Sequence, residues 1–198
     1  MQLSILIPTL TERKHLLQRL IDRLTPQLYD EQGNKMAAII TYEDNREATT
    51  GHKRNQLVKA CETPYASFID DDDDVAMDYV PAILQGINQY QPDCITFLGK
   101  IISGQMMTEF EFRIKNPYDS KATKIGNRYV YRRPPNHLCA IRTEILRQYP
   151  FPDKTRFEDY EQCLTMAKED ALKTEYHINK TLYYYFYTKK QGDKSYGE

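Results

Sequence analysis

The sequence predicts an α/β fold, with a mainly parallel central sheet flanked by helices, and three observations lead to this prediction. Short apolar runs of strand length alternate with longer segments whose apolar residues recur at helical spacing. The alternation continues over residues 3–98, as it does in strand–helix–strand units of a parallel sheet. One apolar run ends in five consecutive aspartates, residues 70–74, and ligands of such sheets bind just beyond the carboxyl ends of the strands.

Length and composition set the outer limits. The chain has 198 residues, a length that predicts one domain, residues 1–198. Its formal net charge of −1 gives no overall bias toward binding nucleic acid or a membrane. The first apolar run stops at Pro8 and has no basic leader, so we expect neither a signal peptide nor an integral membrane segment. Four scattered cysteines without a CxxC pair are typical of reduced thiols, so a cytoplasmic protein is expected.

Each element of the first half can be predicted in order. The expected strands share short apolar cores and span residues 3–7, 36–42, 65–69 and 94–98. The first helix should lie between Thr9 and Pro26, because Thr9 and Glu12 have capping-box spacing and leucines recur at helical intervals. A second helix should begin after Gly51, and a third should span about residues 78–89.

The pattern changes after residue 98. Alternation of aromatic and charged residues around 110–114 predicts a half-exposed strand. Residues 113–133 form a basic segment with seven Lys and Arg residues against Asp119 alone. Residues 139–141 predict a strand, and residues 142–149 predict a short helix. A final helix over 158–168 should turn Tyr160, Leu164 and Ala167 inward.

The five aspartates predict a divalent-metal site that holds a diphosphate. Neighbouring carboxylates repel one another, so their pKa values rise unless a cation is bound, and their hard oxygens suit Mg²⁺, Mn²⁺ or Ca²⁺. An EF-hand loop is excluded, because Val75 and Pro81 stand where it needs Gly and Glu. A solvated acidic run would lack the apolar residues found on both sides, and a helix N-cap would need just one aspartate.

Four segments resemble motifs of the family 2 glycosyltransferases of GT-A fold, in the family's order. Residues 4–12, 52–57 and 68–73 resemble, in turn, its opening strand with Pro-Thr, its Arg-Asn helix and its Asp-x-Asp-Asp. Residues 140–146, followed by 157–161, resemble its late segment that ends in a Glu-Asp pair. The sequence departs from the family at Thr11, where Asn is common, and at residues 43–45. Lys189 and Lys190 stand where the family often has a metal-binding His, and residues 99–137 match no motif.

The resemblance implies a metal-dependent, inverting glycosyltransferase of hexosyltransferase type. It would move a sugar from a nucleotide diphosphate sugar, with UDP the expected nucleotide, to an acceptor hydroxyl, using Mn²⁺ or Mg²⁺. Residues 1–98 would be the nucleotide-sugar-binding half and residues 99–198 the acceptor-side half. The acceptor would be a glycan or a lipid-linked sugar, although the basic, Tyr-interleaved segment 113–133 leaves a hydroxylated base in DNA open.

The resemblance also implies roles for particular residues. Asp72 would bind the metal directly, Asp70 would bind it through water or bind the ribose, and Asp159, with Glu158 as its rival, would be the general base. The implied nucleotide-sugar contacts are Pro8, Thr9, Glu12, Asp44, Arg54, Asp70 and Asp71.

Other roles are hypotheses from the residues themselves. His137 is a candidate contact of acceptor or donor sugar, with a structural histidine as the alternative. Arg132 and Arg133 of the basic segment are candidate contacts of an anionic acceptor, with a solvated loop as the alternative. Lys189 and Lys190 are candidates to close over the diphosphate, with solvated tail lysines as the alternative.

Structural roles remain open for several of these residues. Arg54 also suits a surface helix, Glu12 and Asp44 suit caps or turns, and Glu158 and Asp159 suit a helix amino terminus. Two other functions remain open as well. A nucleotidyltransferase would normally show a Gly-rich, Arg-containing loop in place of Pro8-Thr9-Leu10-Thr11, and a non-catalytic nucleotide-sugar-binding module would keep the same fold.

Overall fold

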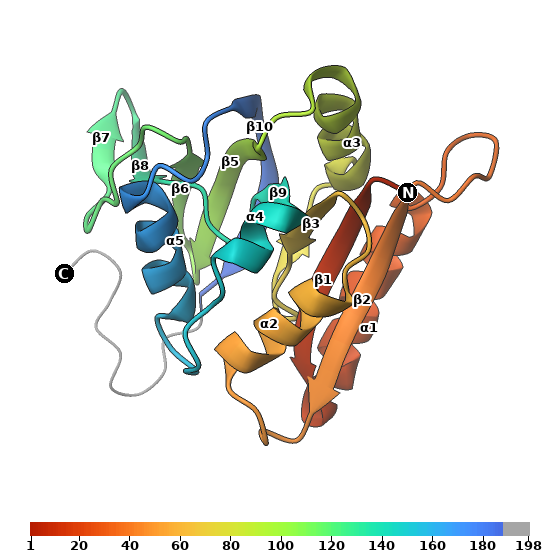
Figure 1. Cartoon of the computed structure of the whole chain (residues 1–198). Coiled ribbons are helices and arrows are strands. Elements are labelled where there is room, and N and C mark those ends of the chain that lie inside the picture. The colour runs from red at the N-terminus through yellow and green to blue at the C-terminus, as the bar shows by residue number, and fades with distance from the viewer. Residues whose placement is uncertain (188–198) are drawn as a thin grey trace.

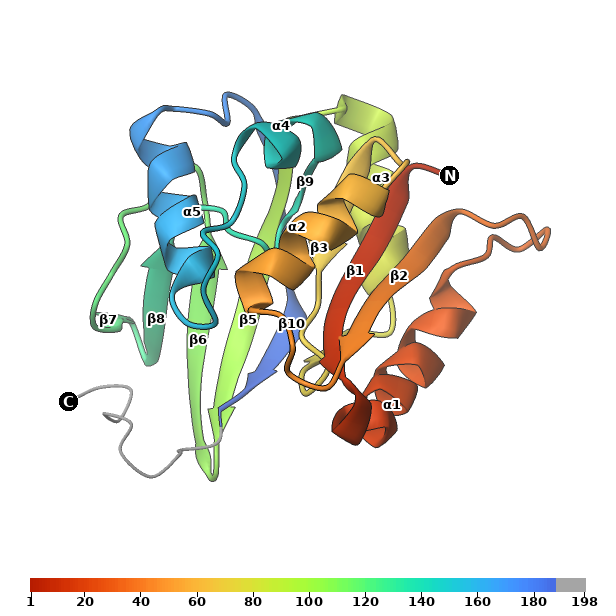
Figure 2. The same cartoon turned by 60° about the horizontal axis from the view of Figure 1, so that its bottom comes forward.

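The computed structural model describes residues 1–187, in which the strands form one ten-stranded sheet (Figure 1). Helices α2, α4 and α5 cover one face of the sheet, and α1 and α3 cover the other (Figures 1 and 2). The helices have these bounds: η1 Thr11–Arg13, α1 Lys14–Leu24, η2 Thr25–Gln27, α2 Thr50–Ala60, α3 Tyr79–Tyr90, α4 Thr143–Gln148 and α5 Glu158–Lys168. Within residues 1–187, no helix combines the length and the apolar character needed to cross a membrane.

The first half of the chain forms the parallel part of the sheet. Strand β1 (Leu3–Leu10) lies between β2 (Ala37–Asp44) and β3 (Tyr65–Phe68) and is parallel to both. Strand β9 (Ala140–Arg142) is antiparallel to β3 and to β5 (Cys94–Ser103), and it lies between them. The predicted α/β architecture is therefore confirmed, with one antiparallel strand at its centre.

The second half extends the sheet from β5. Strand β10 (Glu175–Phe186) runs parallel to β5, and the short β4 (Asp74–Val75) is antiparallel to β10. The remaining strands form the outer part of the sheet: β6 (Met106–Phe112) pairs with β5, β8 (Arg128–Arg133) with β6, and β7 (Thr123–Ile125) with β8. The basic segment therefore lies at the outer edge of the sheet.

The first strand is longer than predicted. It continues through Pro8 to Leu10, paired with β2. The carbonyl of Leu6 accepts a hydrogen bond from the amide of Ile69, on the β3 side. Since residues two apart in a strand face the same way, Pro8 also faces the β3 side, where β3 has already ended at Phe68. Its missing N–H therefore breaks no ladder hydrogen bond.

Two further predictions about helices were wrong. The Thr9–Glu12 capping box does not form, because α1 begins at Lys14 after a 3-10 turn, and Arg13 at its N-cap makes no side-chain cap bond. The α5 bounds are confirmed, but Ala167 is exposed. The inward residues of α5 are Glu158, Gln162, Cys163 and Met166. Because Arg54 binds Glu158 in the first turn, the face that carries residue 158 turns inward.

Candidate active site at the carboxyl ends of the strands

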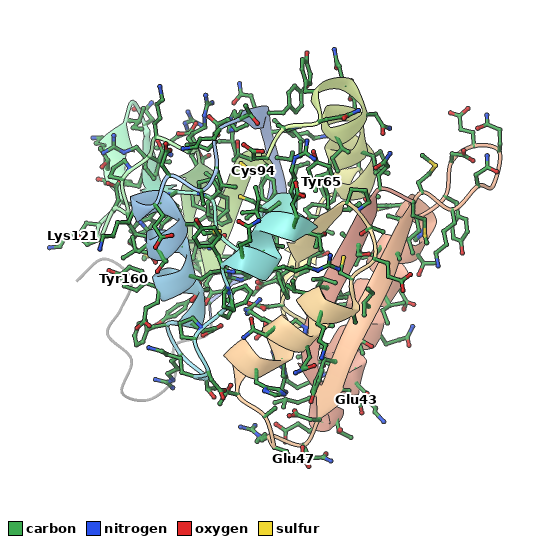
Figure 3. The ribbon with its side chains drawn as sticks, viewed as in Figure 1. Glu43, Glu47, Tyr65, Cys94, Lys121 and Tyr160 are labelled. Atoms are coloured by element: carbon green, nitrogen blue, oxygen red, sulfur yellow. The ribbon has the colours of Figure 1, made fainter. Side chains whose placement is uncertain are left out.

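The ends of β1, β2 and β3 meet at one edge of the sheet, as parallel strands require. In Figure 3, Glu43 and Glu47 mark this edge, whereas Tyr65 and Cys94, the first residues of β3 and β5, lie toward the opposite edge. At the ends of β1 and β3, the hydroxyl of Thr9 donates a hydrogen bond of 2.7 Å to Asp71. The predicted contacts from these strands are thus brought together.

Arg54 is the central cation of this edge. Its side chain on α2 is 3% exposed and lies against the rings of Phe68 and Phe151. Its Nη2 is 2.9 Å from Asp70, and its Nε is 3.2 Å from Glu158, which lies 104 residues later. The surface-helix alternative for Arg54 is therefore wrong, since this residue joins the end of β3 to the start of α5.

The three groups of this cluster change one another's ionisation. Burial alone would lower the pKa of Arg54, but Asp70 and Glu158 raise it above its usual value. Burial would raise the pKa of Asp70, yet Arg54 and His137 outweigh it and hold that pKa well below its usual range. Burial raises the pKa of Glu158, against the effect of Arg54. Asp70 is therefore an anion at neutral pH.

Three arginines from η1 and α1 hold the aspartate run, and we call them the arginine clasp. The Nη2 of Arg13 lies 2.8 Å from Asp71 and 2.5 Å from Asp72. Arg19 donates to the backbone carbonyls of residues 72 and 73, and Arg23 binds both carboxylate oxygens of Asp74, at 3.0 and 3.1 Å. The sequence analysis missed the clasp, although Arg19 and Arg23 lie one helical turn apart.

The aspartates differ sharply in exposure. The side chain of Asp71 is 1% exposed and that of Asp72 is 48% exposed, while that of Asp70 is 31% exposed. Burial raises the pKa of Asp71, an effect that the Thr9 hydrogen bond and Arg13 reduce. Asp72 and Asp70 are therefore the most exposed carboxylates of the run, while Asp74, at 24%, has both its oxygens bound by Arg23.

Asp73 has a structural role. It is fully buried, and it accepts hydrogen bonds from the hydroxyl of Tyr183, at 2.6 Å, and from the amide of Phe186, at 2.9 Å. Burial and the nearby Asp70 raise its pKa well above the usual value. None of the five aspartates caps α3, because this helix starts at Tyr79 and its N-cap residue is Asp78.

The aspartate run offers oxygen ligands for a metal ion, but it offers few of them. Among residues 1–187, no three His, Cys, Asp or Glu side chains converge as a metal-binding group. Asp70 and Asp72 offer two partly exposed hard-oxygen ligands, which fit a cation whose other ligands are phosphate and water. Lys189 and Lys190 lie outside the described residues.

The end of β2 carries a buried ion pair. Lys53 on α2 binds Asp44 and also donates to the carbonyl of Thr9, at 3.0 Å. Although burial opposes it, Lys53 and backbone amides lower the pKa of Asp44. Glu12, by contrast, is exposed and pairs with Arg46. Asp44 thus accepts hydrogen bonds from backbone amides of the turn after β2, which is the turn role that the sequence left open for it. Lys53 links it to Thr9.

His137 stands between two acids. Its Nε2 is 3.9 Å from Asp70 and its Nδ1 is 3.7 Å from Asp159, distances too long for hydrogen bonds. The residue is 4% exposed, and neither ring nitrogen has a hydrogen-bond partner within the described chain. Asp159 is more open, with its side chain 35% exposed. The structure therefore brings Asp70, His137 and Asp159 together.

Arg132 and Arg133 lie on β8, in the outer part of the sheet. Arg132 pairs with Asp119 at 3.0 Å, and Arg133 donates to the carbonyl of Asp119. The guanidinium of Arg133 also lies over the rings of Tyr118 and Tyr131. Within residues 1–187, the side-chain hydrogen bonds and ion pairs of these two arginines go to Asp119 and to the backbone of β8, and none goes to a strand-end carboxylate. Their role toward an acceptor stays a prediction.

Crystal structures of TarS, a glycosyltransferase of S. aureus, are similar to this chain. TarS 1-349 in complex with UDP-GlcNAc has a TM-score of 0.66 and 16% identity, over 96% of this chain and 60% of that chain. TarS 1-349 in complex with UDP has the same TM-score and identity, over 95% and 61%. A third structure of TarS has a TM-score of 0.65 and 17% identity, over 94% and 37%.

This chain thus spans about 60% of the length of TarS 1-349. No protein-family model matches the sequence, and a search of functionally described proteins finds no match. At this identity the likeness shows the fold, which is the GT-A-like fold of these glycosyltransferase structures. The fold expected from the four motifs is confirmed.

Proposed function

We propose that this protein is a glycosyltransferase that moves a sugar from a nucleotide diphosphate sugar, with UDP the expected nucleotide, to an acceptor hydroxyl. The observation that carries the proposal is the cluster in which Arg54 joins Asp70 to Glu158, beside Asp159 and His137. It gathers acids and a buried cation from three distant segments at the edge where such folds bind ligands. The similarity of this chain's fold to that of TarS in complex with UDP-GlcNAc supports the choice of donor.

The donor would lie along the ends of β1, β2 and β3. Thr9 and Asp44 stand where the base and ribose would sit, and Asp70 and Asp72 face the diphosphate. A bound Mn²⁺ or Mg²⁺, held by Asp72 with support from Asp70, would neutralise charge on the leaving diphosphate. Glu12 and Pro8 belong to the same edge as further donor contacts.

Asp159 is better suited than Glu158 to be the general base. Glu158 is 4% exposed and is bound by Arg54, whereas the carboxylate of Asp159 is open to solvent. In the proposed step, Asp159 accepts the proton of the acceptor hydroxyl while the hydroxyl oxygen bonds to the anomeric carbon. The bond from that carbon to the phosphate oxygen breaks, and its electron pair leaves with UDP. This single displacement inverts the anomeric centre.

The acceptor is proposed to be a glycan or a lipid-linked sugar, met in the cytoplasm, with Arg132 and Arg133 as its contacts should it carry phosphate. A hydroxylated DNA base is the alternative acceptor. The positive charge of the basic segment 113–133 supports both a phosphate-bearing sugar acceptor and DNA, and it does not distinguish between them.

The test is a screen of nucleotide sugars with Mn²⁺ that measures release of the nucleoside diphosphate. We expect Asp159→Asn to lower turnover by about 10²–10⁴, the usual effect of losing a general base, with donor affinity retained. Glu158→Gln is the matched variant, and a larger loss there would reverse the two roles. Donor binding without release would indicate a binding module, and pyrophosphate release from a nucleoside triphosphate and a sugar phosphate would indicate a nucleotidyltransferase.

A further inference from the structure

Phe157, the residue before α5, combines exposure with an unusual backbone conformation. Its φ is 63° and its ψ is 13°, in the left-handed region, and it is 69% exposed. Within residues 1–187, the other non-glycine residues with positive φ are Arg46, Gln91 and Asp170. A bulky apolar residue in this region is a strained outlier, and such strain gathers at functional sites.

The surrounding contacts enforce this conformation. The side chain of Asn55 on α2 exchanges hydrogen bonds with the backbone of Phe151, at 2.8 and 2.9 Å, and the amide of Gly51 donates to the carbonyl of Lys154, at 2.9 Å. The approach is so close that a Cβ at Gly51 would lie 1.9 Å from the carbonyl oxygen of Pro152. Four residues after Lys154, at Glu158, the chain must enter α5.

The first residue of α5 is held as firmly as the preceding segment. Glu158 must point inward to Arg54, so the chain has to reverse sharply between Lys154 and Glu158. Phe157 absorbs this reversal. Its ring is left facing solvent, two residues before the open carboxylate of Asp159.

The position of Asp159 indicates what approaches this ring. Resting on the proposed function, the acceptor hydroxyl must come within hydrogen-bond distance of Asp159, so the body of the acceptor lies close to Phe157. An aromatic ring offers a flat apolar surface, and the C–H face of a pyranose is an apolar surface of similar size. Burying part of both against each other removes apolar area from water.

We propose that Phe157 is a stacking platform for the acceptor, and that the acceptor presents a pyranose ring to it. The flat, exposed phenyl ring matches the apolar face of a pyranose. The first turn of α5 holds three acids, Glu158, Asp159 and Glu161, and no basic residue. Two of these acids are paired with cations, Glu158 with Arg54 and Glu161 with Lys154, and Arg156 directly precedes Phe157. Asp159 is the acid of this turn whose carboxylate stays partly exposed, beside the ring.

The composition of the chain offers a direct test of stacking. The sequence contains no tryptophan, so Phe157→Trp places a single tryptophan at the proposed platform. We expect its fluorescence to change, with saturation, on titration with at least one of the methyl pyranosides of glucose, galactose and N-acetylglucosamine. A short single-stranded DNA oligonucleotide should cause no change.

The matched control for this titration is Tyr90→Trp. Tyr90 is 55% exposed at the end of α3, where it stacks on Tyr176, and it precedes β5 at the edge opposite the aspartates. Its fluorescence should respond to none of the glycosides. A response of both tryptophans would show nonspecific binding and would overturn the proposal.

A second pair of variants separates strain from function. Phe157→Gly and Gln91→Gly each place glycine at a left-handed position, so each should raise Tm by about 2 °C. Phe157→Gly alone should raise the KM for the responding glycoside, by about tenfold, with donor KM unchanged. Greater stability together with weaker acceptor use would identify the strain as serving the acceptor.

The outcomes distinguish this inference from the proposed function. If no glycoside changes the fluorescence of the Phe157→Trp protein, the platform is overturned, even where nucleotide-sugar turnover is normal. If the oligonucleotide alone changes it, the pyranose is overturned in favour of a base-bearing acceptor. If the wild type releases no nucleoside diphosphate from any donor while a glycoside still binds Phe157→Trp, the transferase fails and the sugar platform stands.

Discussion

The aspartate run at residues 70–74 and the basic segment at residues 113–133 both concentrate like charge, yet the fold neutralises them differently. The run is held by four arginines from three helical segments, η1, α1 and α2: Arg13, Arg19 and Arg23 of the clasp, and Arg54 of α2. In the basic segment, each of three arginines forms an ion pair with one acid of a strand or loop. The pairs are Arg113–Glu175, Arg128–Glu109 and Arg132–Asp119. These three arginines remain 39–57% exposed.

The difference shows what distinguishes a site from a charged surface. Exposed pairs contribute little to stability and are easily replaced by water and salt. Buried like charges are costly unless cations converge on them, and here convergence draws helices α1 and α2 to one strand end. The carboxylates of Asp70 and Asp72 nevertheless stay partly exposed to solvent, and a ligand site requires such exposed groups.

The largest effect is expected at Asp72. Asp72→Asn removes one ligand charge and almost no volume, so it should abolish turnover while the protein stays folded. EDTA should stop the wild type likewise, and Mn²⁺ or Mg²⁺ should restore it. Asp119→Asn is the matched change in the basic segment and should leave turnover near the wild-type level. Wild-type activity of Asp72→Asn at saturating Mn²⁺ would contradict the metal assignment.

The next effect concerns stability. Arg54→Gln leaves Glu158 buried without its cation, so the free energy of unfolding should fall by about 3–5 kcal/mol. Arg132→Gln breaks an exposed pair and should cost at most about 1 kcal/mol. Urea unfolding of both variants measures the difference. Equal losses would mean that the two regions do not differ as described.

The dependence of stability on pH should have two parts. Burial raises the pKa of Asp71, Asp73 and Glu158, so these carboxyl groups bind protons at a higher pH in the folded state than in the unfolded state. Stability should therefore rise as pH falls from neutral toward the unfolded pKa values, 3.8 for Asp and 4.5 for Glu. Asp70 has a lowered pKa, so its contribution is present above 3.8 and is lost as pH falls further.

Urea unfolding across this pH range should therefore show a maximum at mildly acidic pH. In Asp73→Asn the rise toward this maximum should be smaller, because one of the raised carboxyl groups is gone. A steady loss of stability from neutral pH downward would be inconsistent with the buried carboxyl groups described above.

The smallest effect is expected in the basic segment. Replacing both Arg132 and Arg133 by Ala should raise the acceptor KM a few-fold and leave the donor KM unchanged, if the acceptor carries phosphate. The effect should shrink as salt is added, since exposed charges are screened. An unchanged acceptor KM across the salt series would remove the anionic acceptor.

Much of the fold could be predicted from the sequence, because the strands and helices of the first half depend on the spacing of neighbouring apolar residues. The apolar runs and helical stripes of the first half predicted β1, β2, β3 and their helices. The placement of β9 between β3 and β5 was not readable, because no local signal in three residues selects two antiparallel partners. The inward face of α5 was mispredicted because the ion pair of Glu158 with Arg54 overrides the apolar stripe.

The candidate site was readable in part for the same reason. Motifs indicated Asp70, Asp72, Arg54 and Asp159, each of which stands at a strand end or a helix start. The clasp, the Lys53–Asp44 pair and the Tyr183 hydroxyl were missed, since each joins elements through contacts that leave no spacing in the sequence. Which aspartate is buried likewise depends on Thr9 and Tyr183, not on the run itself.

The bonds of Asp73 to Tyr183 and Phe186 span 110 and 113 residues. During synthesis, the aspartate loop therefore leaves the ribosome long before the strand that anchors it. Until β10 has emerged, Asp73 has no donor from that strand and its buried position is not yet formed. The burial of Asp73 is thus completed late, after the long-range closure that slows folding. A nascent chain cut before β10 would carry every predicted donor contact and the clasp, yet it would lack the hydroxyl and the amide that bind Asp73.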